Sequence, residues 1–248
     1  MKDFIFAAVF AFQFLTRIPV PVLIEPREPI VRKALICFPL VGWVLGLILY
    51  AVWWLLNATG KCSPVTIAVL LVTIETLLTG AFHLDGLADT FDAFLSSGKS
   101  REEKLAIMKD SRIGVMGAVA LTLTLVLKIT LLNELLEHTL PAAILIYPAI
   151  GRWAQVALYV FSPYARERGL GLIFSSAANK KALVYATLIL LPCFTLPISL
   201  PATFLAAAYL WVFRGYVHKQ INGITGDVLG ASTVLSEIMF LLGIVIFS

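Results

Sequence analysis

Long stretches of apolar residues, separated by short polar segments, dominate this sequence. Most of them approach the roughly 20 residues that a helix needs to cross a bilayer. The candidate spans lie near residues 34–56, 64–83, 113–132, 141–161, 182–198, 201–213 and 229–247. The sixth is short, and its boundary with the fifth is open. The pattern predicts an all-α, polytopic integral membrane bundle with about seven transmembrane helices, forming one membrane-embedded domain over residues 1–248.

An eighth apolar run, residues 4–14, is too short to cross a bilayer comfortably. It ends at Thr16-Arg17-Ile18-Pro19-Val20-Pro21, and no A-x-A-like cleavage site follows it. A signal peptide would carry such a site. We therefore expect an N-terminal helix that is interfacial or half-inserted and stays in the mature protein.

The composition supports a membrane protein. Of the 248 residues, 60% are hydrophobic and 14% are charged, whereas a soluble domain has roughly 45–50% apolar and about 25% charged residues. So few polar residues cannot cover a soluble core, and so many apolar ones exclude disorder. The three cysteines are widely spaced and form neither a disulfide framework nor a CxxC metal site.

The basic residues are distributed unequally between the loops. If the chain crosses the membrane at each span, one side carries 15 Lys and Arg, in residues 17–33, 84–112, 162–181 and 214–228, whereas the other side carries Lys61 alone. Short loops rich in Lys and Arg stay in the cytoplasm. These four loops are therefore expected to face the cytoplasm, with the C-terminus outside. We expect no nucleic acid partner, because no soluble module interleaves basic and aromatic residues.

Three aspartates follow the second span. Asp85, Asp89 and Asp92 are spaced i, i+4, i+7, which places them on one face of a helix. Stacked carboxylates repel one another, and a hard divalent cation removes that repulsion. Oxygen-only ligands suit Mg²⁺ in combination with substrate phosphates. The pattern favours a magnesium site at the inner membrane edge, and a solvated acidic helix end is the alternative.

Two other segments carry candidate chemistry. Lys109 and Arg112 flank Asp110, an arrangement that suits a pyrophosphate and its metal. Positive-inside anchoring with a local ion pair is the alternative there. Gly226 and Asp227 lie in a glycine-rich turn before the last span, where free backbone N–H groups suit a phosphate. A helix N-cap is the alternative for that turn.

Ionisable residues also lie inside the spans. Glu75, Arg152 and Glu237 are each roughly 12 Å from the cytoplasmic end of their helix at about 1.5 Å per residue. Because an unpaired charge at this depth is costly, Arg152 is predicted to pair with Glu75, Glu237 or both and to form the floor of a cytoplasmic cavity. Lys128 lies deeper and is predicted to extend toward the outer surface.

Together these motifs resemble the cobalamin synthase family, the adenosylcobinamide-GDP ribazoletransferases. The resemblance covers almost the whole chain. It rests on residues 16–21, 38–42 with 45–46, 83–90, 108–114, 225–227 with 230–231, Arg152 and Glu237. Two small departures, Gly80-Ala81-Phe82 and Asn222-Gly223, touch no proposed ligand.

The resemblance implies a reaction in which adenosylcobinamide-GDP and α-ribazole, or its 5′-phosphate, give adenosylcobalamin, or its phosphate, and GMP. It also implies an enzyme of the cytoplasmic membrane of a prokaryote, with the lipid bilayer as partner and the oligomeric state open. The expected site has four groups: Mg²⁺ on Asp85, Asp89, Asp92 and Asp110; phosphate contacts from Arg17, Lys109 and Arg112; the turn at Gly226 and Asp227; and His83 or Asp92 as proton acceptor. His83 is equally well explained as an interfacial histidine that makes one hydrogen bond.

Three other functions compete. A CDP-alcohol phosphotransferase also breaks a nucleotide pyrophosphate through aspartates, but its D-G-x-x-A-R signature has Asp89 at the arginine position here, and its second half is missing. A secondary transporter would place carboxylates near the bilayer midplane, often within inverted repeats. A structural scaffold gives no reason for stacked aspartates.

Overall fold

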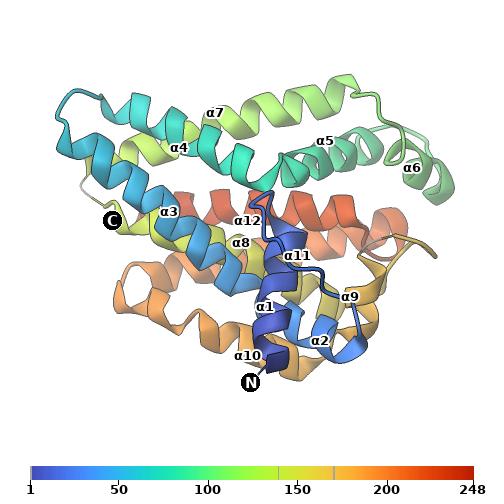
Figure 1. The fold of residues 1–248 in the computed structure, drawn as a ribbon. Coiled ribbons are helices and arrows are strands. Elements are labelled where there is room, and N and C mark those ends of the chain that lie inside the picture. Colours follow the sequence, from blue (N-terminus) through green and yellow to red (C-terminus); the bar gives the residue numbers. More distant parts are fainter. Residues whose placement is uncertain (1, 139, 170) are drawn as a thin grey trace.

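The computed structural model describes residues 2–138, 140–169 and 171–248. Most of them are helical (Figure 1). The elements in chain order are α1 (Lys2–Leu15), α2 (Glu28–Ile36), α3 (Phe38–Ala58), α4 (Pro64–Thr79), α5 (Phe82–Phe94), α6 (Arg101–Ile107), α7 (Val115–Glu137), α8 (Ala142–Phe161), α9 (Leu172–Ala177), α10 (Lys180–Ile189), the 3₁₀-helix η1 (Leu191–Thr195), α11 (Ser199–Ile221) and α12 (Gly226–Phe247). Within the described residues, β-pairing is limited to a parallel bridge between Tyr164 and Ile224.

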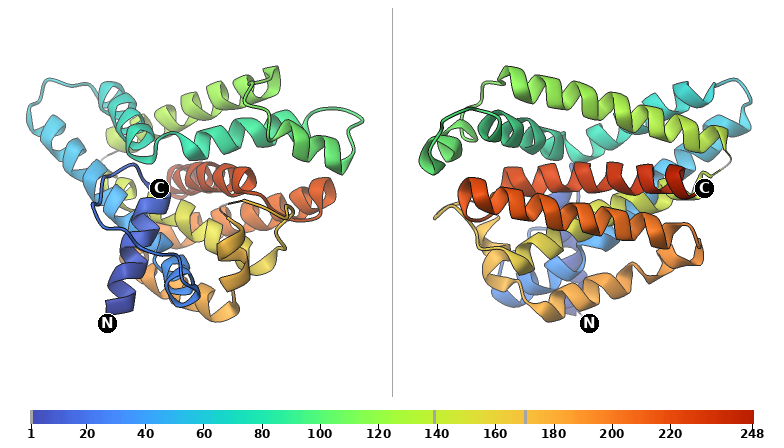
Figure 2. Two further views of the ribbon diagram at one scale, coloured as in Figure 1. Left: turned by 45° about the vertical axis from the view of Figure 1, so that its right-hand side comes forward. Right: turned by 180° about the vertical axis from the view of Figure 1, so that it is seen from behind.

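The long helices form stacked layers. In Figures 1 and 2, α4, α5 and α7 form the upper layer, α12 runs through the middle with α11 beside it, and α10 lies at the opposite side. The most enclosed of the long helices are α8 and α12. In each of them, 78% of the 18-residue apolar stretch is buried inside the molecule. These two helices carry Arg152 and Glu237, so their buried charges lie in the centre of the bundle.

Five helices are long and apolar enough to cross a membrane: α3, α7, α8, α11 and α12. The pair α4 and α5 passes the same test together, as one span bent by 91° or as a re-entrant loop. The predicted all-α, polytopic membrane class is therefore confirmed. The number of long spans is five or six, where the apolar runs gave about seven.

The difference arises in the fifth and sixth apolar runs. Residues 182–198 form the short helix α10 and the 3₁₀-helix η1 instead of one long helix, and Pro192 lies at the start of η1. Proline lacks the backbone N–H group that an α-helix needs and so cannot continue α10. The sixth apolar run is part of a longer helix, α11. This helix continues past the apolar residues, through Arg214 and Lys219, to Ile221.

The N-terminal helix lies crosswise to the long helices, as Figure 1 shows. Ala7, Ala11 and Leu15 on α1 are buried, whereas Phe4 and Ile5 near its start are exposed. The expected N-terminal helix is therefore present, and its C-terminal end reaches the interior of the bundle. Its depth in a bilayer stays a prediction.

The break between α4 and α5 changes the direction of the chain within two residues. Gly80 and Ala81 both have left-handed backbone conformations, with φ of +63° and +58°. The backbone N–H of Arg17 donates to the carbonyl oxygen of Leu78 at 2.7 Å, which ties the end of α1 to this break. The aspartate segment thus begins a new helix, α5, at the point where α1 and α4 meet.

Candidate active site

The centre of the candidate site is the crossing of α5 and the first turn of α12. A Cβ atom on Gly86 would lie 2.6 Å from the backbone oxygen of Asp227, and one on Gly230 would lie 3.1 Å from the Cα of His83. Such distances exclude a larger side chain at Gly86 unless the helices move apart. Glycine at this crossing therefore brings the aspartates of α5 next to Asp227, which is 142 residues away in sequence.

A cavity of about 460 Å³ opens beside this crossing. Its charged and titratable lining combines groups that are distant in sequence: Arg17, His83, Asp85, Arg166 and Asp227. Aromatic side chains complete the wall, namely Phe14, Phe82, Tyr159 and Tyr164. Two carboxylates, two guanidinium groups and an imidazole therefore face one space that is large enough for part of a nucleotide-sized substrate.

Several predicted residues reach this cavity. The guanidinium carbon of Arg17 lies 4.3 Å from the centre of the Phe82 ring, a cation–π arrangement. Asp89, one turn beyond Asp85, is within electrostatic range of Asp227, Asp85 and Arg166. The first turn of α12 is capped by Thr225, whose Oγ1 accepts from Val228 N at 3.3 Å. Asp227 is therefore free of the capping role that was the alternative for it.

Asp92 points to a different neighbour. Its two carboxylate oxygens accept hydrogen bonds from the backbone N–H groups of Gly114 at 2.7 Å and Gly117 at 2.8 Å. These amides lie at the N-terminus of α7, where a negative charge is favourable. In this structure Asp92 therefore holds α7 against α5, and it lines a separate hollow instead of the cavity beside Asp85 and Asp227.

The segment with Lys109, Asp110 and Arg112 also lies away from the cavity. Asp110 and Arg112 line a separate, more open hollow of about 290 Å³, together with Asp92. Their side chains form an ion pair at 2.6 Å, and the hydrogen bonds from Arg112 lower the pKa of Asp110 to about 2. Lys109 is exposed. The structure thus does not bring Asp110, Lys109 and Arg112 together with Asp85.

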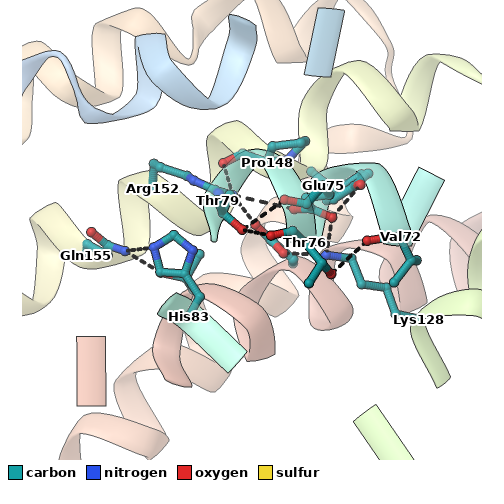
Figure 3. Close-up of polar contacts among 12 residues, drawn as sticks. Val72, Glu75, Thr76, Thr79, His83, Lys128, Pro148, Arg152 and Gln155 are labelled. Carbon is teal, nitrogen blue, oxygen red and sulfur yellow. Dashed lines mark hydrogen bonds and ion pairs between the residues drawn. The ribbon is translucent and has the colours of Figure 1, made fainter. Parts of the chain in front are cut away.

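His83 is already engaged. Its Nε2 lies 3.0 Å from Nε2 of Gln155, and the same amide nitrogen donates to Oγ1 of Thr233 at 2.6 Å (Figure 3). An amide nitrogen is a donor only, so Nε2 of His83 accepts this hydrogen bond and the ring is neutral. The predicted role of His83 as proton acceptor would require its other nitrogen or a displaced Gln155.

Beside His83 lies a network of buried charges (Figure 3). Arg152 forms an ion pair with Glu237 and lies 3.7 Å from Glu75, so the predicted pairing is confirmed. Lys128 contradicts the prediction of an outward-reaching side chain, because its Nζ lies 2.7 Å from a carboxylate oxygen of both Glu75 and Glu237. Tyr147 donates to Glu75 at 2.8 Å. His83 lines both this region and the large cavity.

The reason for the error on Lys128 is the length of α7. The N-terminal half of this helix packs against α5 and its C-terminal half against α4. The helix therefore starts well beyond the C-terminal end of α4, and residue 128 reaches the level of Glu75. Counting depth from the start of each apolar run assumes that all helices start at one level, which is wrong for α7.

Comparison with known proteins decides the family. A model of the cobalamin-5-phosphate synthase family matches residues 7–245. The chain belongs to this family. An adenosylcobinamide-GDP ribazoletransferase of Pseudomonas fluorescens is 38% identical over 244 residues, which cover 96% of this chain and 98% of the relative. Relatives with the same name are 38% identical in Geotalea daltonii and 36% identical in Caldanaerobacter subterraneus, each over at least 95% of both chains. No solved structure matches.

Membership in the cobalamin-5-phosphate synthase family raises the question of whether the cavity fits Mg²⁺. Among the residues that the structure describes, no three His, Cys, Asp or Glu side chains are close enough to hold a metal alone. Asp85 and Asp227 nevertheless supply oxygen donors to one cavity. Mg²⁺ is usually bound by one or two carboxylates plus substrate phosphates. The donor set fits an ion that is shared with a phosphate-bearing substrate.

For this member of the cobalamin-5-phosphate synthase family, the sequence motifs missed the loop after α8. Arg166 in this loop forms an ion pair with Asp227 at 2.7 Å. The hydroxyl of Tyr164 lies about 3 Å from where Cβ atoms on Gly169 and Gly171 would be, so the loop is wrapped around it. Burial raises the pKa of Tyr164, which keeps it a neutral hydroxyl. Gly169 and Gly171 are the sequence signal for a tightly turned loop here, but they lie nearer to Arg168 and do not single out Arg166.

Proposed function

We propose that this protein joins adenosylcobinamide-GDP to α-ribazole, or to α-ribazole 5′-phosphate, and releases GMP. The observation that carries the proposal is the α5–α12 crossing, which places Asp85 and Asp227 at one cavity with two arginines, and Asp89 within electrostatic range of both. It lies in a chain whose relatives carry the name of this reaction over almost their whole length. A lipid synthase and a transporter are not favoured, because the family match covers residues 7–245.

The reaction is attack by a ribose hydroxyl on a pyrophosphate. The hydroxyl oxygen bonds to the phosphorus on the cobinamide side, the bond from that phosphorus to the bridging oxygen breaks, and GMP leaves with the bridging oxygen. The hydroxyl proton passes to a protein base, for which Asp89 and His83 are the candidates nearest to the cavity. Asp85 and Asp227, together with the diphosphate, would hold Mg²⁺, which when bound offsets the negative charge on the leaving GMP.

We further propose that the protein lies in the cytoplasmic membrane of a prokaryote with this cavity facing the cytoplasm. The basic loops predict that orientation. The cavity is lined by the end of α8, the start of α12 and the loop after α8, which belong to the side where these loops lie. A nucleotide-bearing substrate would therefore be reached from the cytoplasm.

The activity is tested on the full chain in lipid nanodiscs with adenosylcobinamide-GDP, α-ribazole and Mg²⁺, by following GMP release and corrinoid product. We expect turnover that EDTA abolishes and Mg²⁺ restores. Asp85→Asn should lower the rate by about 100-fold or more, because it removes a charge that acts at the reacting phosphate. Glu102→Gln, on the exposed helix α6, is the matched control and should leave the rate unchanged. Folded protein without metal-dependent GMP release would refute the proposal.

A further inference from the structure

The loop that follows α8 is fixed directly over the first turn of α12. Ala165 N donates to Ile224 O at 2.8 Å, and Ile224 N donates to Pro163 O at 2.9 Å. From the other side, Arg101 of α6 donates to Ala165 O at 3.0 Å. These contacts define the position of the backbone on the N-terminal side of Arg166. The fold therefore places Arg166 next to Asp227, and their ion pair is not a chance contact of a mobile surface side chain.

Arg166 makes only part of the hydrogen bonds that a guanidinium group offers. Its Nη2 donates to Oδ2 of Asp227 at 2.7 Å. Its Nε is buried and has no hydrogen-bond partner within the part of the chain that the structure describes. The side chain is 15% exposed, and it lines the large cavity. Arginine prefers two parallel hydrogen bonds to a carboxylate or phosphate. The single hydrogen bond to Asp227 therefore leaves other N–H donors of the guanidinium group without a partner.

The charges around the cavity favour an anion at this point. Arg17 and Arg166 are the cations among its described lining residues, whereas the predicted phosphate contacts Lys109 and Arg112 lie elsewhere. Arg17 is stacked on Phe82. Arg166 is the cation that directly contacts a carboxylate of the candidate reaction centre. Asp227 also accepts a hydrogen bond from Thr225 at 3.2 Å, so it keeps a partner if Arg166 turns away.

We propose that Arg166 binds the diphosphate of the substrate and that Asp227 occupies Arg166 only while the substrate is absent. This inference rests on the proposed function, because the ligand is the diphosphate bridge of that substrate. The incoming phosphate oxygens take both edges of the guanidinium fork and displace Oδ2 of Asp227. The displaced carboxylate is then free to act as an oxygen donor beside Asp85. Binding of the anion and release of the carboxylate are thus one exchange.

The test measures binding of inorganic pyrophosphate to the full-length protein in nanodiscs, by calorimetry in EDTA. Arg166→Ala should weaken binding by about tenfold or more, because it removes charge-assisted hydrogen bonds. Asp227→Asn should tighten binding several-fold, because it removes both the competing partner and a like charge. The double variant should bind far more weakly than Asp227→Asn, because without the arginine there is no ion pair for pyrophosphate to displace. Arg168→Ala, an exposed arginine of the same loop, is the matched control and should change binding less than twofold.

A purely structural ion pair predicts the opposite for Asp227. If Asp227→Asn weakens pyrophosphate binding as Arg166→Ala does, or if Arg166→Ala binds as tightly as the wild type and the Arg168→Ala control, the inference is overturned. Arg166→Lys keeps the positive charge but lacks the two parallel donors of the guanidinium group, so it should weaken binding three- to tenfold. This variant provides the test if Arg166→Ala does not fold. Pyrophosphate binding needs no turnover. A protein that shows this pattern but forms no GMP would therefore contradict the proposed function and leave the exchange standing.

Discussion

The charge balance at single buried residues determines how well this bundle folds. Glu75, Glu237, Lys128 and Arg152 form a neutral set of two anions and two cations from four helices. Their side chains are at most 7% exposed. Removing one partner of a buried ion pair leaves an uncompensated charge, which costs far more than the pair itself contributes.

Lys128→Met is therefore expected to lower the free energy of unfolding by about 3–5 kcal/mol. The double variant Glu75→Gln/Lys128→Met should recover most of that loss, because the remaining Arg152–Glu237 pair is again neutral. Unfolding in mixed detergent micelles measures both. Lys61→Met, at an exposed lysine, is the control and should leave stability unchanged. A single variant as stable as the wild type would show that Lys128 does not compensate a buried negative charge.

At the scale of the element, the break between α4 and α5 is the feature that creates the site. The aspartate helix could not approach α12 if residues 64–94 continued as one straight helix. The backbone at Gly80 and Ala81 makes the turn with positive φ at both residues. For alanine that conformation costs about 1–2 kcal/mol relative to the right-handed region, so one residue of the break is strained.

Ala81→Gly is accordingly expected to raise the free energy of unfolding by about 0.5–1 kcal/mol, after the entropic cost of glycine is subtracted. Gly80→Ala should destabilise the protein, because its Cβ would lie 2.6 Å from Cγ of Arg17 in addition to the strained φ. Thermal unfolding of the two variants provides the measurement. If Ala81→Gly lowers the unfolding temperature, the left-handed conformation is not the dominant strain at this break.

The helices were predictable from sequence, but the break was not. Runs of apolar residues located α3, α7, α8 and α12 because length and hydropathy are local properties. Ala81 gives no turn signal, since alanine favours helices. The i, i+4, i+7 spacing placed Asp85, Asp89 and Asp92 on one face, but it could not tell that the amides of α7 occupy Asp92. Which side chain faces which neighbour depends on tertiary contacts.

At the scale of the whole molecule, the orientation in the membrane can be tested with a native residue. Cys62 lies in the short connection between α3 and α4, on the side predicted to be external, whereas Cys37 and Cys193 are buried. In right-side-out vesicles, a membrane-impermeant maleimide should label Cys62 without permeabilisation. Ser97→Cys in a Cys62→Ser background should be labelled only after permeabilisation, since residue 97 is exposed in a basic loop that is predicted to be cytoplasmic. The reverse pattern would invert the proposed topology.

Arg166 shows why the complete cavity needed the whole molecule. In sequence it is one of 19 Lys and Arg, and a basic loop residue is explained equally well by topology. Only the contacts of its loop with residues 222–225 place it over Asp227. Phosphate recognition was therefore assigned to Lys109 and Arg112, whose charges flank an aspartate in sequence but line a different hollow.

The position of Glu237 in the last helix has a consequence for synthesis of the protein. Lys128 can meet Glu75 as soon as α4 and α7 have entered the bilayer, but Arg152 on α8 must wait until α12 leaves the ribosome to gain its Glu237 partner. Until then a nascent chain carries an arginine in lipid with one distant carboxylate. A chain that stops before α12 would lack both Glu237 and Asp227. Its charged centre would be exposed and its cavity incomplete, so we expect quality-control proteases to degrade it.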